Sequence, residues 1–523
     1  MNKIKVFLDR FGWYFCIFFC VIIYLFLAYK NPFADNSLVS NLEPYPDTLL
    51  YSFPAWNWVR GNGWNLGVAE KIVRISIPNT YGYFLVPFLK IFGDIRAFYI
   101  ANIVLGLGSI VFFGLALKNL LKKPKWYIVG YFGFLLVTNF YFFNQPQLVM
   151  AENVNYFLVS VFLFLLSLKF KWIQLVPMGI LVIVTLCLKN TNLVLGGALA
   201  ISFLIKIFWE KLRFLNIKKV LVIGSILGLV IAVFYLPKIL VLSRSAFNIK
   251  YFAKNFGFYF SCLSGNTCRN LWYWQRMVSW DVIAIFLLGS ISMLFDKNKR
   301  LLFLELILPL VLLVLAMSFF VDTEGRHIEV LLPIILMVGA IGFDKLLVKV
   351  EKPLMVVFVF LMANMFLTSY QNNIWEMKII SLKKQVGLNF RHREDPWNYL
   401  CLRMIQKFMV DKNQAYFGSF LPIYFFDAYN VKLNYLPLAS NQDFMYGRGL
   451  EKYFPLPLKN IYKEKLKEGK EIYLSDYYVS NSSDDWRRQW NEIVADKKLE
   501  KVYQSPLDNC NIYKLLENKK TTR

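Results

Sequence analysis

The stretch FGWYFCIFFCVIIYLFLAY, residues 11–29, decides the fold class of this chain. It is apolar throughout, and its length matches the roughly 20 residues that a helix needs to cross a bilayer. Residues 1–5 begin like the basic region of a signal peptide, but no cleavage site of small residues follows the apolar stretch. We therefore expect a first membrane-spanning helix that the protein retains.

The composition extends this prediction to the rest of the chain. The protein has 523 residues, of which 57% are hydrophobic and 18% aromatic, and its mean hydropathy is +0.44. Soluble domains are roughly 45–50% apolar, so the sequence predicts a polytopic α-helical membrane protein with about eleven spans. The predicted spans are 11–29, 96–117, 126–143, 153–168, 172–187, 192–209, 219–237, 280–295, 301–320, 328–343 and 353–370. The net charge of +25 comes without a basic helix or a nucleic-acid-binding motif, so nucleic acid is not an expected partner.

Lysine and arginine are distributed unevenly between the loops, and this predicts the orientation. Alternate short loops are basic, for example 118–125, 206–219 and 345–352, as is typical of cytoplasmic loops. We expect an integral protein of the plasma (inner) membrane with a cytoplasmic N-terminus. An odd number of spans then places the C-terminal region on the extracytoplasmic side.

Residues 238–279 do not follow this charge rule. They are predicted to lie outside, yet they carry six Lys and Arg side chains and many aromatic ones. One interpretation is an aromatic belt at the membrane interface. The other is an outer loop that contacts an anionic lipid head group or the acceptor. Cys262 and Cys268 flank a short loop in this region, and the sequence leaves open whether they pair.

The chain divides into two predicted domains. Residues 1–370 form the transmembrane domain, with a long first outside loop at 31–95. In that loop, segment 81–92 is apolar but too short to span, which fits a helix on the membrane surface. The sequence then becomes polar and mixed, which predicts a small α/β domain over 371–523 on the outer face. Its strands are expected at 414–417, 431–436, 471–474 and 511–515, and its helices at 397–410, 462–468 and 484–495.

Two isolated acids fall at the predicted outer rim of the bundle. Asp47 stands in LEPYPDTLLYS, residues 42–52, and Glu152 is the only acid between Asp94 and Glu210. A carboxylate at a membrane rim is costly to place there and is often functional. Asp47 can also serve as a helix N-cap, and Glu152 can also be a solvated loop acid. We expect both of them to be catalytic.

Three basic or titratable side chains fall at the same predicted face. Lys189 lies in a short outside turn, and Arg326 and His327 lie in DTEGRHIEVLLP, residues 322–333. The planar guanidinium of arginine matches phosphate, whereas a lysine at this depth can simply snorkel. A carboxylate can take a proton from an acceptor, and cations can stabilise a departing phosphate. The set therefore predicts transfer from a phosphate-linked donor.

The arrangement of the acids resembles that in the GT-C glycosyltransferases. The likeness covers residues 10–370 and is greatest for the branch of protein O-mannosyltransferases, aminoarabinose transferases and RgtA-like enzymes. That branch has an acid in the first outside loop, followed by a surface helix with hydroxyl or aromatic residues, which matches Asp47 with Tyr51. Its second acid, at the entry to the fourth span, matches Glu152 with Asn153.

The basic residues are similar to the family pattern as well. A basic residue after the fifth span matches Lys189, although arginine is commoner there. An Arg-aromatic pair before a proline-bearing span matches Arg326 and His327 with Pro333, with His in place of the usual Tyr. The tandem acid pair of the O-mannosyltransferases is absent, because Pro46 precedes Asp47 and Thr48 follows it. This absence weakens any inference of protein mannosylation.

The resemblance implies an inverting glycosyltransferase with a polyprenyl-phosphate sugar as donor and an extracytoplasmic glycan, lipid or protein as acceptor. In this interpretation Asp47 is the base or positions the acceptor, Glu152 orients a substrate, and Tyr51 and Asn153 bind substrate. Lys189, Arg326 and His327 hold the donor phosphate. No cofactor is expected, and no residue pattern indicates a divalent metal.

The alternative class is a polytopic transporter or flippase for a lipid or glycan, and a membrane scaffold is the third. A transporter accounts for the spans, the aromatic residues and the buried acid. It does not account for the long first outside loop or the C-terminal domain. Transporters also often show repeated halves, and none is evident in this sequence.

Overall fold

The structure is a computed structural model, and its elements alternate between long apolar helices and short polar connections. It describes residues 2–28, 47–59, 61, 63–64, 66–68, 71–73, 80–93, 96–121, 125–147, 150–169, 171–188, 192–210, 249–270, 273–296, 299–319, 325–348, 350, 352–372, 405, 407–409, 411–412, 414–419, 434–438, 457–476, 484–504 and 511–518.

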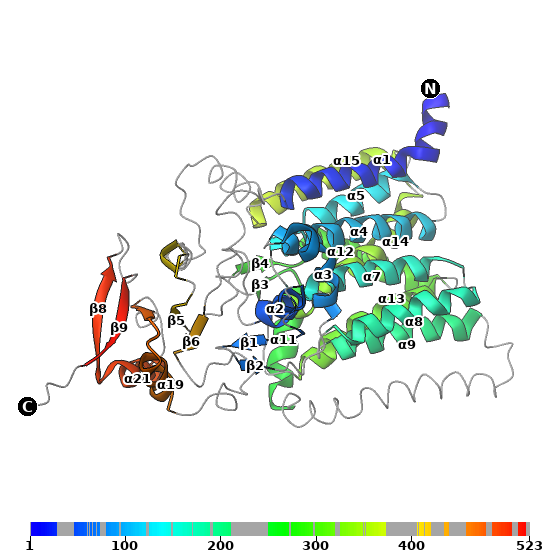
Figure 1. Cartoon of the computed structure of the whole chain (residues 1–523). Coiled ribbons are helices and arrows are strands. Elements are labelled where there is room, and N and C mark those ends of the chain that lie inside the picture. Colours follow the sequence, from blue (N-terminus) through cyan, green and yellow to red (C-terminus); the bar gives the residue numbers. More distant parts are fainter. Residues whose placement is uncertain are drawn as a thin grey trace, which may run out of the picture.

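The helices of the first 372 residues form one bundle (Figure 1). Its apolar helices are α1 (Asn2–Ala28), α4 (Arg96–Leu120), α5 (Trp126–Val137), α7 (Glu152–Ser167), α8 (Leu175–Leu186), α9 (Asn192–Glu210), α12 (Trp280–Phe295), α13 (Arg300–Met317), α14 (Leu332–Leu347) and α15 (Pro353–Asn372). The pairs α4–α7, α12–α14, α1–α5 and α9–α13 pack directly against each other. Between α12 and α14 the backbones are so close that a Cβ at Gly342 would lie 2.0 Å from the Cα of Gly289. Glycine permits this close approach, as it does between helices in membranes.

The apolar helices lie where hydropathy predicts spans, but their lengths differ. Among the described residues, four stretches are long and apolar enough to cross a membrane: Phe7–Ala28, Ala97–Leu120, Arg300–Met317 and Glu329–Leu347. The other apolar stretches have 10–17 residues, for example Asn192–Ile207 of α9 and Pro353–Asn364 of α15, and α12 has the bounds predicted for it. A helix of 12 residues rises only about 18 Å, whereas the hydrocarbon core is about 30 Å thick. The predicted span 219–237 lies outside the described residues, so the number of about eleven spans stays a prediction.

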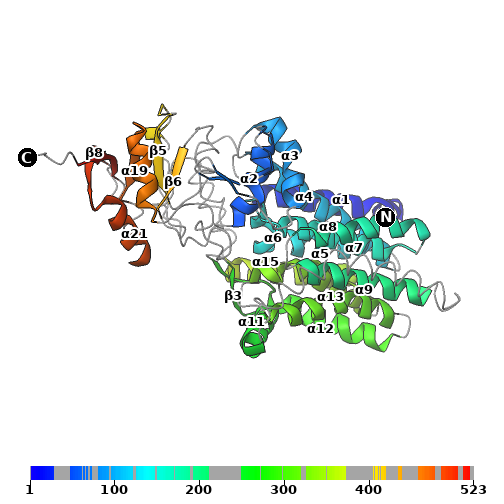
Figure 2. The same ribbon diagram turned by 60° about the horizontal axis from the view of Figure 1, so that its bottom comes forward.

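Short elements gather at one end of the bundle, and the N-terminus lies at the other end (Figures 1 and 2). They are α2 (Asp47–Val59), α3 (Thr80–Phe92), α11 (Phe252–Leu263), and the hairpins of β1 (Leu66–Val68) with β2 (Lys71–Val73) and of β3 (Thr267–Asn270) with β4 (Tyr273–Arg276). Helix α3 confirms the helix predicted at 81–92, and its position on the membrane surface stays a prediction. It ends at Gly93, whose φ is 69° and whose N–H donates to the carbonyl of Leu89 over 2.8 Å.

A hydrogen bond ties one of these short elements to the bundle, and a disulfide ties two of them to each other. The backbone N–H of Thr80, at the start of α3, donates to the carbonyl of Cys187 over 3.3 Å. Cys262 on α11 and Cys268 on β3 form a disulfide, which answers the question that the sequence left open. The connecting segments α6 (Phe140–Asn144), η2 (Gln145–Gln147), η6 (Gly325–His327) and η7 (Glu329–Leu331) complete this end of the bundle.

The C-terminal region contains a five-stranded sheet in the order β6-β5-β7-β9-β8. Its elements are β5 (Tyr416–Ser419), β6 (Asn434–Pro437), α19 (Lys459–Lys467), β7 (Ile472–Ser475), α21 (Asp484–Val494), β8 (Lys497–Tyr503) and β9 (Ile512–Glu517). Strands β5, β6 and β7 are parallel, and β9 is antiparallel to both β7 and β8. Each predicted strand is present. Of the predicted helix at 397–410, the structure describes only residues 405 and 407–409, and all of them are helical. An independent domain on the outer face stays a prediction.

Candidate active site

Glu152 opens helix α7 and is fully buried. It lies in the first turn of the helix, where the helix dipole favours a negative charge. The N-cap residue Ala151 gives this helix end no side-chain hydrogen bond. Glu152 is therefore an acid inside the protein rather than a solvated loop residue.

A small cleft with an empty volume of about 240 Å³ surrounds this acid. Its lining comes from α7, α9, α13 and the segment from η6 to η7: Glu152, Asn155, Asn192, Leu195, Leu313, Met317, Arg326, His327 and Val330. The structure thus brings together an acid, an arginine and a histidine that are far apart in the sequence. Asn155, one turn after Glu152 on α7, exchanges amide hydrogen bonds of 3.1 and 2.5 Å with Asn192 of α9.

Arg326 and His327, the two residues of η6 that line the cleft, have different surroundings. Arg326 is half-buried, and its Nη1 lies 4.0 Å from the Sδ of Met150. His327 lies with its Nδ1 3.1 Å from the hydroxyl of Tyr259 on α11. The disulfide at Cys262 fixes the same helix α11 to β3. The disulfide-linked segment therefore determines where the imidazole of His327 lies.

Glu329 is a second buried acid next to the cleft, and the sequence analysis missed it. It belongs to η7, is fully buried, and accepts a hydrogen bond from Nε2 of Gln145. It stands three residues after Arg326 at the start of an apolar helix. Isolation identified Glu152, but Asp322 and Glu324 precede Glu329 within seven residues, so the same signal does not single it out. Its place at the start of an apolar helix is the signal that could have identified it.

Tyr51 and Tyr81, both from the predicted first outside loop, lie near the cleft. Tyr51 of α2 is buried, and its ring centroid lies 5.9 Å from that of Tyr81 on α3. The Tyr81 hydroxyl donates to Oδ1 of Asn102 over 2.6 Å, and Nδ2 of Asn102 donates to the carbonyl of Pro146 over 3.4 Å. Burial raises the pKa of Tyr81, its bond to Asn102 lowers it, and the negative charge of Glu152 adds to the rise. The loop therefore lies within electrostatic range of the cleft.

Four predicted site residues are not part of the cleft as described, and Tyr51, whose contacts are given above, is one of them. Asp47 begins helix α2, and the position of its side chain is outside the described part of the structure. Lys189 lies outside the described residues. Asn153 is buried, but it does not line the cleft, and its Nδ2 donates to the carbonyl of Met150 over 3.2 Å. Their roles stay predictions.

The cleft contains residue types that the sequence analysis did not single out. Asn155, Asn192 and Tyr259 each sit within or beside an apolar helix, where an isolated amide or hydroxyl gives no periodic signal. Only their contacts reveal them. Among the described residues, no group of three or more His, Cys, Asp or Glu side chains is placed to hold a metal ion.

Comparisons with known proteins agree on the fold. A structure of ArnT from Cupriavidus metallidurans bound to undecaprenyl phosphate covers 98% of this chain and 99% of its own, with 12% identity and a TM-score of 0.59. The apo state of ArnT from the same organism covers 97% and 98%, with 12% identity and a TM-score of 0.56. No protein-family model matches the chain, and no curated protein matches it in sequence.

These structures define the class of fold. ArnT is an aminoarabinose transferase of the GT-C superfamily, so the resemblance seen in the sequence is confirmed for the fold. Together with its long apolar helices, this fold makes the chain an integral membrane protein. At 12% identity the likeness concerns the fold alone, and it assigns no role to any residue.

Proposed function

We propose that the protein is a membrane glycosyltransferase that moves a sugar from a polyprenyl-phosphate carrier to an extracytoplasmic acceptor. The observation that carries this proposal is the meeting of Glu152, Arg326 and His327 in one cleft. The bundle around the cleft has the fold of ArnT, and one ArnT structure holds undecaprenyl phosphate. That ligand supplies the chemical class of the carrier.

In the proposed reaction, a hydroxyl of the acceptor attacks the anomeric carbon on the side opposite the phosphate. The new carbon–oxygen bond forms as the bond to the phosphate oxygen breaks, so the configuration inverts. A carboxylate takes the proton of the acceptor; we assign this step to Asp47 and the orientation of the substrates to Glu152. The products are the glycosylated acceptor and polyprenyl phosphate.

The leaving phosphate gains negative charge as the bond breaks, and cations stabilise that charge. Arg326 offers two parallel hydrogen bonds to a phosphate, and we assign Lys189 and His327 to the same group. Tyr51 and Asn153 are assigned to substrate binding. These steps use side chains alone, so the proposal includes no cofactor.

We place the cleft at the extracytoplasmic rim, with the N-terminus in the cytoplasm and residues 371–523 as an outer domain. The disulfide between Cys262 and Cys268 supports this orientation, because disulfides persist in oxidising compartments. The N-terminus lies at the end of the bundle opposite to α2 and α11 (Figures 1 and 2), which agrees with the basic loops on the cytoplasmic side.

The proposal is tested by incubating membranes that contain the protein with polyprenyl-phosphate sugars. The readouts are release of polyprenyl phosphate and transfer of labelled sugar to glycan, lipid and protein fractions. We expect Asp47→Asn and Glu152→Gln each to lower turnover by roughly 10²–10⁴, since both remove a carboxylate from proton transfer or positioning. Glu305→Gln is the matched control, because Glu305 is equally a buried acid but does not line the cleft.

A wild-type protein that consumes no polyprenyl-phosphate sugar, with any acceptor fraction, contradicts the transferase proposal. Normal turnover by the folded Glu152→Gln variant removes Glu152 from the site. An equal loss in the Glu305→Gln variant means that any buried acid is needed for folding, and the assignment of the cleft then fails.

A further inference from the structure

An apolar groove runs along the surface of the bundle between α1, α5 and α15, away from the cleft at Glu152. It has an empty volume of about 1200 Å³, and its walls include Phe19 and Ile23 of α1, Phe134 of α5, and Phe358 and Leu361 of α15. The groove is lined almost entirely by carbon atoms of large side chains. Its shape and chemistry fit a hydrocarbon chain.

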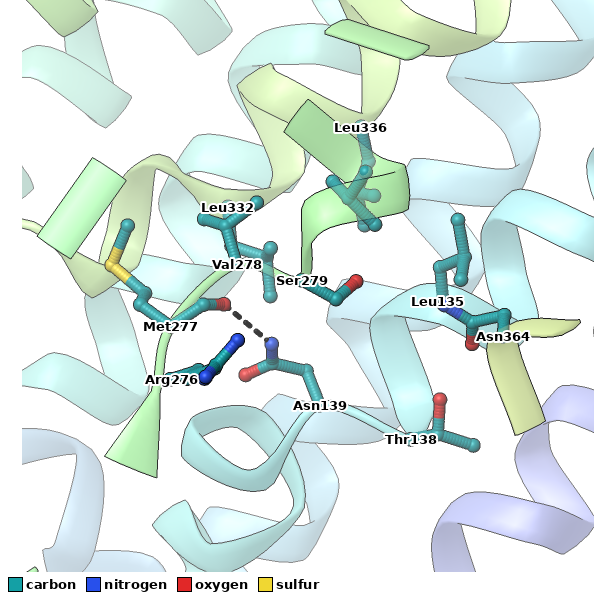
Figure 3. Close-up of a pocket in the computed structure, with 11 residues that line it drawn as sticks. Leu135, Thr138, Asn139, Arg276, Met277, Val278, Ser279, Leu332, Leu336 and Asn364 are labelled. Atoms are coloured by element: carbon teal, nitrogen blue, oxygen red, sulfur yellow. Dashed lines mark hydrogen bonds between the residues drawn. The ribbon is translucent and has the colours of Figure 1, made fainter. Parts of the chain in front are cut away.

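A polar cleft, drawn in Figure 3, follows this groove along α5 and α15. Its empty volume is about 340 Å³, and its polar lining consists of Thr138, Asn139, Arg276, Ser279 and Asn364. Thr138 follows Phe134 of the groove by about one helical turn, and Asn364 follows Leu361 by about one turn. The groove and the polar cleft therefore lie on the same seam between α5 and α15.

Arg276 gives this polar cleft its charge. It is the last residue of β4, and its guanidinium is half-buried beside Asn139 (Figure 3). Within the part of the chain that the structure describes, the side chain of Arg276 forms no hydrogen bond or ion pair, while its backbone belongs to the β3–β4 hairpin. The acid closest along the chain, Asp281, instead accepts a hydrogen bond of 2.6 Å from Nδ2 of Asn364. The cleft thus offers one cation and several neutral polar groups to an anion.

The groove also contains a buried hydroxyl that has no acceptor. Tyr131 of α5 lines the groove and is only 2% exposed, and its hydroxyl has no hydrogen-bond partner among the described residues. A buried donor without an acceptor is unfavourable, because it has lost its hydrogen bond to water. An ester carbonyl of a lipid would supply the missing acceptor.

We infer that this seam is a binding site for an anionic glycerophospholipid of the surrounding bilayer. An acyl chain lies in the groove, the ester accepts from Tyr131, and the phosphate of the head group binds Arg276. From Trp126 to Thr138 the seam is about 18 Å long, close to the roughly 15 Å of half a hydrocarbon core. The inference does not depend on the proposed transfer reaction.

The test compares full-length protein in nanodiscs of phosphatidylcholine with protein in nanodiscs that also contain phosphatidylglycerol. The lipids retained by the protein are identified by native mass spectrometry, and the unfolding temperature is measured in both. We expect preferential retention of phosphatidylglycerol and a higher unfolding temperature with it. Arg276→Gln should lower that preference about tenfold, because a charge-assisted hydrogen bond is lost, and Arg276→Lys should keep part of it.

Two further variants separate the groove from general surface charge. Leu361→Trp fills the groove and should lower retention of phosphatidylglycerol while Arg276 is intact. Lys254→Gln is the matched control, because Lys254 is an exposed cation on α11 that lines neither cleft; it should leave the preference unchanged. Arg276→Lys and Leu361→Trp test the site even where Arg276→Gln does not yield folded protein.

The inference is wrong if the wild type retains both lipids equally, or if Arg276→Lys and Leu361→Trp retain phosphatidylglycerol as the wild type does. Free inorganic phosphate is added as a separate arm. Full competition by phosphate alone shows that the site recognises the anion and not a lipid, which also contradicts the inference. Displacement by undecaprenyl phosphate at equal concentration assigns the seam to a prenyl lipid instead.

Discussion

The two clefts at one end of the bundle lie on either side of the segment 329–332, and they differ in their charges. Val330 lines the cleft that holds Glu152, Arg326 and His327, whereas Leu332 lines the cleft of Arg276. The first contains a fully buried carboxylate together with its cation, and the second contains a cation with neutral polar groups. A carboxylate can accept a proton, and a cation can stabilise a leaving group; a site without a carboxylate lacks the first of these functions. This difference is why we propose the first cleft as the active site and the second as a lipid-binding site.

Substitution of Arg326 tests the proposal that the cleft of Glu152 is the active site, and it has the largest expected effect. Arg326→Ala should lower turnover by roughly 10²–10³, because a donor that stabilises developing charge is lost. Arg326→Lys should lower it less but measurably, since lysine keeps the charge and loses the planar pair of donors. Both are measured with polyprenyl-phosphate sugar in detergent. If Arg326→Ala turns over the donor as fast as the wild type does, the proposal that the first cleft is the active site loses its phosphate-binding residue.

Substitution of Glu329 tests whether the buried hydrogen bond in the segment between the clefts stabilises the folded protein. Glu329→Leu leaves Nε2 of Gln145 without the acceptor it has in the wild type. We expect the free energy of unfolding to fall by about 1–3 kcal/mol, measured by denaturation in detergent. Glu329→Gln is the control, because its side-chain oxygen can still accept. A Glu329→Leu protein as stable as wild type contradicts this structural role.

Tyr259 has the smallest expected effect, because it acts through His327 and not on a substrate. Tyr259→Phe removes a hydroxyl 3.1 Å from Nδ1 of His327. A single neutral hydrogen bond contributes about 0.5–1.5 kcal/mol, so donor affinity should fall by roughly two- to tenfold. Tyr251→Phe, in the segment before α11, should leave affinity unchanged. If the two variants behave alike, the contact does not position His327.

The positions of the apolar helices could be predicted because hydropathy is a local property of the chain. The span predicted at 280–295 coincides with α12, and the helix predicted at 81–92 is α3. Strand β8 was missed, since KKLEKVY, Lys497–Tyr503, is mostly charged at the edge of the sheet and gives neither an apolar run nor a regular alternation. The number of spans stays a prediction, because helix length and composition alone identify four.

The candidate site could be predicted only in part, for a physical reason. Glu152, Arg326 and His327 lie next to the ends of apolar segments that the predicted topology places at one face, so their polar side chains could be identified from the sequence. Asn155 and Asn192 became visible only through their mutual hydrogen bonds. Whether two polar residues on different helices meet depends on packing angles and rotations of the helices, and a hydropathy pattern does not specify these.

The most direct test of the central claim is to measure binding and turnover separately for two variants of one cleft. Undecaprenyl phosphate is titrated into purified wild type, Arg326→Ala and Glu152→Gln, and turnover is measured on the same preparations. The account predicts that Arg326→Ala binds the lipid phosphate about tenfold or more weakly, since a charge-assisted contact is lost. Glu152→Gln should bind it as the wild type does and fail to turn over the sugar donor. Wild-type affinity in Arg326→Ala, together with wild-type turnover in Glu152→Gln, would contradict the assignment of this cleft as the active site.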